Sequence, residues 1–183
     1  MTPVPFRRRK VLVCLSVFLC CFLPGAAQER YVGTVHSPKG IGVFYESGSP
    51  EQVSHLSFTL DFDGILGGHT RRPGFRIGFQ KHFFVPVYRL ADGTDLDFFY
   101  GPGLVAGAVR DGGGFQGPMA ALRGIAGLRF VFPERPFTLG FAFSADLGVH
   151  MQRVAGQNSN ILRLYRGGLR RVWLPEIHLS YRF

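Results

Sequence analysis

The sequence predicts an all-β fold, a transmembrane antiparallel up-and-down β-barrel of eight strands. Apolar residues recur with a period of two, and their face is rich in Leu and in Phe, which contributes 19 of the 183 residues. The other face combines both signs of charge with many of the 25 glycines. A soluble β-sandwich also alternates but buries its apolar face, whereas a membrane barrel turns that face toward lipid and keeps polar and small residues in its lumen. The second arrangement suits a Phe-rich face opposite a charged one.

The N-terminal segment predicts export. A cationic block at 7–10 precedes an apolar stretch at 11–23 and small residues at 25–27. This order is typical of a secretory signal peptide, and the apolar stretch is too short to span a bilayer as a retained anchor helix. We expect cleavage after Ala27, so that 1–27 is a signal peptide and 28–183 a single outer-membrane β-barrel domain.

The cysteine count and the net charge exclude some kinds of functional site and partner for that domain. All three cysteines lie before residue 28, which excludes disulfides and cysteine-based sites from the predicted mature chain. The signal holds four of the 21 basic residues and none of the 12 acidic ones, so the net charge falls from +9 to 17 − 12 = +5. Nucleic acid is therefore not an expected partner.

Six segments carry the alternation clearly, at 53–64, 74–85, 95–109, 119–132, 137–150 and 172–183. In the first, Leu56, Phe58 and Leu60 alternate with Ser57 and Thr59. Turn-forming sequences such as ADG at 91–93 and PERP at 133–136 separate the segments. Barrels of this class have an even number of strands, so two weaker candidates, 39–47 and 160–166, complete eight. Side chains can fill the interior of a barrel this small, which predicts a plugged lumen.

The chain ends in LPEIHLSYRF, an alternating strand that finishes on Phe183 with Tyr181 two residues earlier. This ending resembles the C-terminal signal of bacterial outer-membrane barrels. The stretches FFYGPGLVAG and LRLYRGGLRR also resemble small outer-membrane barrel proteins of Bacteroides-like bacteria, similar in form to the OmpX and OmpA barrels. The resemblance implies that the last strand pairs with the first, and that assembly machinery recognises its outer residues. These assembly residues are Ile177, Leu179, Tyr181 and Phe183.

The same resemblance implies a location in the bacterial outer membrane. The partners it implies are outer-membrane lipid and lipopolysaccharide, the barrel assembly machinery, and periplasmic chaperones during biogenesis. A partner membrane protein is a further expectation. No cofactor is expected.

Charged residues on the polar face predict a network inside the barrel. Unpaired charges in a closed lumen are costly, so we expect salt bridges and hydrogen bonds around trapped water. An ion or proton path, or a site for a small polar ligand, is the functional alternative. The predicted network comprises Asp61, Asp63, Arg76, Asp97, Arg123, Arg129, Asp146, Glu176 and Arg182.

His178 and Ser180, with Glu176 before them, have the residue types of a hydrolase triad. Outer-membrane lipid A deacylases are barrels with a His-x-Ser pair, but their active site faces lipid near the outer surface. Here the pair lies on the predicted lumen face near the periplasmic end, and Tyr181 replaces the Asn that follows the family's Ser. A chance pair is favoured, so no enzyme and no catalytic residue is expected. The six histidines are scattered without metal-ligand spacing, so no metal site is expected.

A basic cluster around Tyr165 is the candidate for contact with lipopolysaccharide phosphates. Its members are Arg163, Arg166, Arg170 and Arg171. A solvated loop is the alternative interpretation. The expected function is a structural or interaction role at the cell envelope, through lipopolysaccharide or a partner protein. A narrow channel for ions or small solutes is the first alternative, and a membrane-embedded lipid A hydrolase the second.

Overall fold

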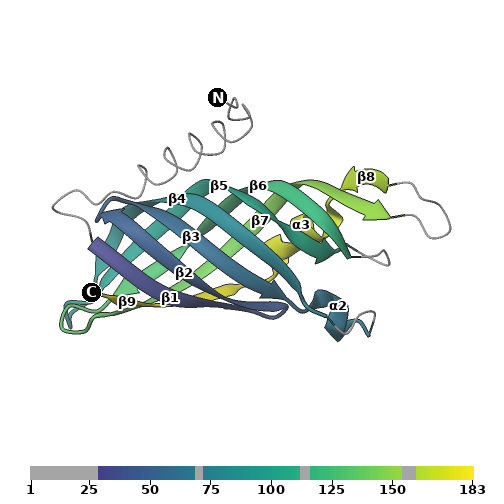
Figure 1. The fold of residues 1–183 in the computed structure, drawn as a ribbon. Helices are drawn as coiled ribbons and strands as arrows, with labels where there is room; N and C mark the ends of the chain where they lie inside the picture. Colours follow the sequence, from purple (N-terminus) through teal and green to yellow (C-terminus); the bar gives the residue numbers. More distant parts are fainter. Residues whose placement is uncertain (1–28, 69–71, 112–115, 154–159) are drawn as a thin grey trace, which may run out of the picture.

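The computed structural model describes residues 29–68, 72–111, 116–153 and 160–183 (Figure 1). The predicted signal peptide, 1–27, lies outside these residues. The strands are β1 (Glu29–Ser37), β2 (Gly40–Ser49), β3 (Gln52–Asp61), β4 (Gly74–Arg89), β5 (Asp95–Arg110), β6 (Gln116–Val131), β7 (Phe137–Arg153), β8 (Asn160–Leu164) and β9 (Glu176–Arg182). Three short helical segments accompany them, α2 (Asp63–Leu66), α3 (Arg166–Arg170) and η1 (Arg171–Trp173).

Eight strands close into an antiparallel barrel. Each strand from β1 to β7 pairs with the next one along the chain, and β9 pairs with both β7 and β1. Figure 1 shows these strands running obliquely around one cylinder. The predicted eight-stranded, up-and-down barrel is confirmed. Within the described residues, no helix is both long enough and apolar enough to cross a bilayer.

The first wall strand, β1, is one that the alternation did not identify. Tyr31 and Val35 are buried in the lumen, and the positions between and beside them are mostly polar, including Arg30, Thr34 and His36. The strand therefore lacks the apolar outer face on which the prediction relied. The weak candidate at 39–47 corresponds to β2.

The other weak candidate, 160–166, is wrong as a wall strand. Among the described residues, β8 pairs only with residues 149–153 of β7, beyond the point where β9 pairs with β7. The eighth wall strand is β9, which begins at Glu176 rather than at Val172. Between β8 and β9 the chain leaves the sheet, and α3 and η1 lie against β7. We call residues 165–175 the insert.

The two ends of the barrel differ in their connections. At the end that holds the C-terminus, short turns join β2 to β3, β4 to β5 and β6 to β7 (Figure 1). In the turn after β4, the Thr94 backbone N–H donates to Asp92 Oδ1 at 3.0 Å and lowers the pKa of the Asp92 carboxyl. Longer segments, including α2 and the insert, lie at the opposite end. We call these the turn end and the loop end.

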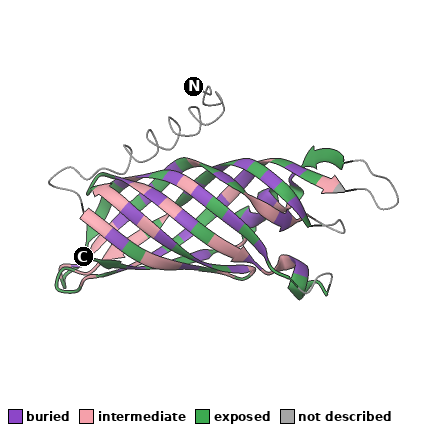
Figure 2. Ribbon diagram, viewed as in Figure 1, coloured by how far each residue is buried: buried purple, intermediate pink, exposed green. Residues whose placement is uncertain are grey.

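Burial is inverted relative to a water-soluble domain. Leu122 on the outer wall is 62% exposed, whereas Arg76 and Asp146 inside are 2% and 0% exposed. Figure 2 shows buried residues alternating with exposed or intermediate ones along much of the barrel wall. Large apolar side chains thus cover the outside of the barrel, and charged ones lie within it.

The lumen also contains two groups of apolar side chains, one toward each end. The group toward the turn end comprises Val53, Phe84, Phe99, Ile125 and Ala142. The group toward the loop end comprises Val105, Val109, Met119, Ala121 and Tyr165. Both groups fill space between the polar side chains of the lumen.

Candidate functional site

Six charged side chains gather in the loop-end half of the lumen, and all are buried. We call them the loop-end charge cluster. They are Asp61 on β3, Arg76 on β4, Arg123 on β6, Asp146 on β7, Arg171 in η1 and Glu176 on β9. Three cations face three anions, so the cluster is formally neutral. This balance lets a low-dielectric interior hold six charges.

Asp146 and Arg123 form the closest ion pair of the cluster. They stand directly opposite each other on β7 and β6. Arg123 Nε donates to Asp146 Oδ1 at 2.6 Å, and Arg123 Nη2 donates to Oδ2 at 2.8 Å. Arg76 Nη1 lies 3.6 Å from the same Oδ2. The two parallel hydrogen bonds fix the orientation of both groups, as is typical of bidentate arginine–carboxylate pairs.

The remaining contacts join the insert to the wall. Arg171 Nη2 donates to Asp61 Oδ2 at 3.2 Å, and Arg171 Nη1 donates to Glu176 Oε1 at 3.5 Å. Arg76 Nη2 lies 3.3 Å from Asp61 Oδ2. Glu176 Oε1 also accepts from the Ser144 hydroxyl at 2.7 Å. Arg171 therefore ties the insert to two wall strands across the lumen.

The burial of Arg171 corrects its predicted place among the lipopolysaccharide contacts. The insert turns inward after β8: the Tyr165 backbone N–H donates to Gly148 O at 2.9 Å. Gly168 lies so close to β7 that a Cβ there would stand 2.3 Å from Asp146 O. This approach brings Arg171 into the lumen. The other three basic residues, Arg163, Arg166 and Arg170, are exposed at the loop end.

A second charge pair lies toward the turn end. Arg129 Nη2 donates to Asp97 Oδ2 at 2.8 Å, and the Arg129 guanidinium carbon lies 3.5 Å from the centre of the Phe84 ring. The structure thus places seven of the nine predicted network residues in the lumen, in two groups.

The other two predicted network residues lie at the rims. Asp63 lies past the end of β3, in α2, and pairs with Lys39 at 2.6 Å. Arg182 lies near the turn end, 3.8 Å from Glu29. The alternating pattern continued through both positions, but Asp63 follows the end of β3 and Arg182 is the last residue of β9, so both lie at a rim of the barrel.

The structure also gathers histidines that the sequence left scattered. His55, His82 and His178 lie in the turn-end half of the lumen beside Glu46. The ring centres of His55 and His82 are 4.6 Å apart, and those of His55 and His178 are 6.0 Å apart. The residues come from four strands, so only the strand register brings them together. The alternating pattern of the sequence indicates that each of them lies on the inward face of its strand. It does not indicate how far along the barrel axis each one lies.

The residues of the hydrolase alternative are not arranged as a catalytic triad. The Ser180 hydroxyl is hydrogen-bonded to the Thr138 hydroxyl. His178 Nε2 lies 3.5 Å from Glu176 Oε2. No hydrogen bond that the structure describes joins Ser180 to His178, so the two do not form a nucleophile–base pair in this geometry.

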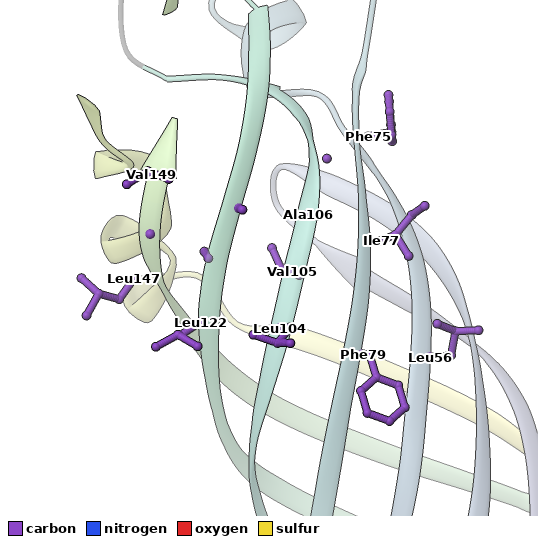
Figure 3. Close-up of a pocket in the computed structure, with 14 residues that line it drawn as sticks. Leu56, Phe75, Ile77, Phe79, Leu104, Val105, Ala106, Leu122, Leu147 and Val149 are labelled. Atoms are coloured by element: carbon purple, nitrogen blue, oxygen red, sulfur yellow. The ribbon is translucent and has the colours of Figure 1, made fainter. Parts of the chain in front are cut away.

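The outer wall carries an apolar groove of about 740 Å³ (Figure 3). Small residues of β5, β6 and β7 leave the space, and larger apolar side chains of β3 to β7 surround it. Figure 3 shows Phe75, Ile77 and Phe79 on one side and Leu122 and Leu147 on the other. The small residues are Ala106, Gly107, Ala120, Ala121 and Gly148. The volume lies within the range of ligand pockets, although this groove opens along the wall.

The predicted assembly residues lie together on the outer side of β9. All four are exposed: Ile177, Leu179, Tyr181 and Phe183. The strand pairs with residues 31–36 of β1, so the last strand closes the barrel against the first, as predicted. The recognition of these residues during assembly stays a prediction.

Comparisons with known proteins were made at the level of sequence and of structure. No protein-family model matches the sequence, and the search of curated proteins finds no match. Among solved structures, the chain is similar to the N-terminal β-barrel domain of Pseudomonas aeruginosa OprF. The sequence identity is 11% and the TM-score 0.48, over 85% of this chain and 96% of that chain. At this level of similarity the match carries no information about function.

Proposed function

We propose that this chain is a bacterial outer-membrane β-barrel protein with a closed lumen, and that it binds lipopolysaccharide on its outer wall. The observation that carries the proposal is the inverted burial: Leu122 is exposed outside while Arg123, the next residue, is buried and paired inside. In water, such an outer wall would expose a continuous apolar surface, which soluble monomers avoid. In a bilayer, the same wall is solvated by lipid.

The filled lumen supports an interaction role over the channel alternative. Two small cavities lined by both polar and apolar side chains of the lumen have volumes of about 10 and 20 Å³. Each suffices for about one water molecule. The insert lies across the loop end, where Tyr165 and Arg171 are buried. A solute would therefore have to displace the insert to pass.

Lipopolysaccharide suits both the groove and the rim because it combines acyl chains with phosphates. The groove reaches Phe75 and Val149 near the loop end, and Val149 pairs with Leu164 of β8. Arg163 precedes Leu164, and Arg166 and Arg170 follow it; all three are exposed. Outer-membrane barrels carry their longer loops on the extracellular side, which is the lipopolysaccharide leaflet. The basic residues and the groove are thus at the same end as these lipids.

Filling the groove is expected to weaken lipopolysaccharide binding. In Ala120→Phe the new ring occupies the groove, and we expect purified lipopolysaccharide to bind the detergent-solubilised barrel about tenfold more weakly, or about 1.4 kcal/mol. The matched control is Ala126→Phe, an outward position of the same strand beyond the groove. Binding is measured by titration at fixed low salt. Equal affinity of both variants and the unchanged barrel would contradict the proposal.

The closure of the lumen predicts an effect of Gly168→Ala on conductance. The unchanged barrel in a planar bilayer is expected to give no discrete current steps. In Gly168→Ala the new methyl group meets the Asp146 carbonyl, so the insert moves away and steps appear. In the control Gly167→Ala the nearest atoms are side-chain atoms of Tyr165 and Asp111, at 3.1 and 3.2 Å, so the new methyl group meets a much milder contact than at Gly168. Steps from the unchanged barrel would favour the channel instead.

A further inference from the structure

Glu46, His55 and His82 form a compact, buried group on the adjacent strands β2, β3 and β4. Glu46 and His55 are direct cross-strand partners, and His82 stands opposite Val53, two residues from His55 on the same face. Nδ1 of His55 lies 2.9 Å from Glu46 Oε1, and Nδ1 of His82 lies 3.3 Å from the same oxygen. One candidate ligand atom from each residue lies within 4.8 Å of the other two. Three metal-ligating groups therefore converge on one point.

The charge of Glu46 is balanced differently from that of the other buried carboxylates. Asp61, Asp97, Asp146 and Glu176 each pair with an arginine. The ion pairs that the structure describes for Glu46 are both with histidine, which is a cation only when protonated. Buried charges in proteins are paired or coordinate metals. A divalent ion between the three residues would supply the positive charge that arginine supplies elsewhere in this lumen.

Space for a further ligand adjoins the group. The residues that line a cavity of about 20 Å³ include Glu46, His82, His178 and Arg129, whose guanidinium pairs with Asp97, and the cavity has room for about one water molecule. Nε2 of His82 is buried without a hydrogen-bond partner among the described atoms. Unsatisfied buried polar atoms in native proteins commonly mark a water or an ion. The pocket thus contains a buried nitrogen atom to which its own side chains offer no hydrogen bond.

We propose that Glu46, His55 and His82 bind a divalent transition-metal ion of the zinc type, with one water in the adjoining cavity as the fourth ligand. Zn–N and Zn–O bonds of about 2.0–2.2 Å in a tetrahedral site separate neighbouring ligand atoms by about 3.3 Å. The observed separations from Glu46 Oε1 are close to this value. Two imidazole nitrogens suit zinc, copper or nickel, whereas magnesium and calcium prefer sites built from oxygen alone.

Aromatic side chains hold the histidine rings in place. Phe44 stacks on His55 with ring centres 4.8 Å apart, and the Phe99 ring lies 5.3 Å from that of His82. These apolar neighbours limit water around the group. Binding through Nδ1 requires neutral imidazoles with their protons on Nε2, so any proton between Nδ1 and Glu46 moves to Nε2 or is released to solvent. Little movement is required, because the rings already face the carboxylate.

Zinc titration of the untagged chain tests the site. The chain is purified in detergent without a histidine tag, stripped with EDTA and titrated with Zn²⁺ by calorimetry, and its bound metal is counted. We expect one ion per chain, and binding at least about tenfold weaker in Glu46→Gln and in His82→Gln, since even supporting residues of metal sites contribute 10–100-fold. The matched control is His150→Gln. His150 is also buried in the lumen but its Nε2 pairs with Val109 O at 2.9 Å, so this variant should bind as the unchanged chain does.

A second measurement covers the case in which the variants do not fold. Co²⁺ added to the stripped, unchanged chain should produce the intense visible absorption of a tetrahedral site, and Zn²⁺ should abolish it. Absence of this band, less than one Zn²⁺ per chain, or equal losses in His150→Gln and His82→Gln would overturn the proposal. The site lies inside the barrel, so the outcome is independent of lipopolysaccharide binding on the outer wall.

Discussion

Arg123→Met is expected to destabilise the barrel by about 3–5 kcal/mol, because it leaves a buried carboxylate without its main partner. Asp146 is 0% exposed, and the two hydrogen bonds that the described residues donate to its carboxylate both come from Arg123. After the substitution its nearest remaining cation is Arg76, at 3.6 Å. The free energy of unfolding is measured by urea titration of the barrel in lipid vesicles.

The double variant Arg123→Met, Asp146→Leu provides the control for Arg123→Met. It removes one cation and one anion, so Arg76 and Arg171 still balance Asp61 and Glu176. We expect it to be more stable than Arg123→Met alone, since replacing a whole buried pair by apolar residues is often nearly neutral. If the single variant lost less than about 1 kcal/mol, the cluster would not depend on this pair.

Leu122→Arg is expected to destabilise the barrel by about 2–4 kcal/mol in a bilayer, because a cation would face lipid near the middle of the wall. Leu122 lies close to the midpoint of β6 and is 62% exposed. A water-soluble protein would tolerate this change, since an exposed Leu replaced by Arg loses little there. The measurement is the same vesicle titration.

The matched control for Leu122→Arg is Tyr88→Arg. Tyr88 is 67% exposed on the outer wall, but it lies one residue before the end of β4 at the turn end. A cation near the membrane interface costs about 0–1 kcal/mol. Equal stability losses at both positions would contradict a bilayer around the wall.

The sequence predicted the wall of the barrel where the strand pattern was sharp. In β3 to β7, alternation placed residues such as Phe143 outside and Asp146 inside, because one side of each strand is solvated differently from the other. In β1 the outward residues are largely polar, so the strand carried no such signal. The insert was equally hidden, since NILRLYR alternates like a strand although the chain leaves the sheet at Tyr165.

For the candidate sites, the sequence predicted on which face of its strand each residue lies, but not which residues of other strands lie beside it. Parity placed Asp97, Arg123 and Asp146 on the inner side, but their pairing depends on register across strands. Glu46, His55 and His82 come together through the register of β2, β3 and β4, which a single sequence does not reveal. Arg171 belongs to a cluster of arginines around Tyr165, and this sequence context predicted a surface position rather than one in the lumen.

An accessibility scan of β6 tests the central claim, an inverted barrel in a lipid bilayer. The predicted mature chain has no cysteine, so single cysteines at 119–128 can be spin-labelled in vesicles and exposed to oxygen, which concentrates in lipid, or to a water-soluble nickel complex. We expect the outward positions 120, 122, 124, 126 and 128 to respond to oxygen, and the positions between them to respond weakly to both reagents. A response of the outward positions to the nickel complex would place the outer wall in water and contradict the account.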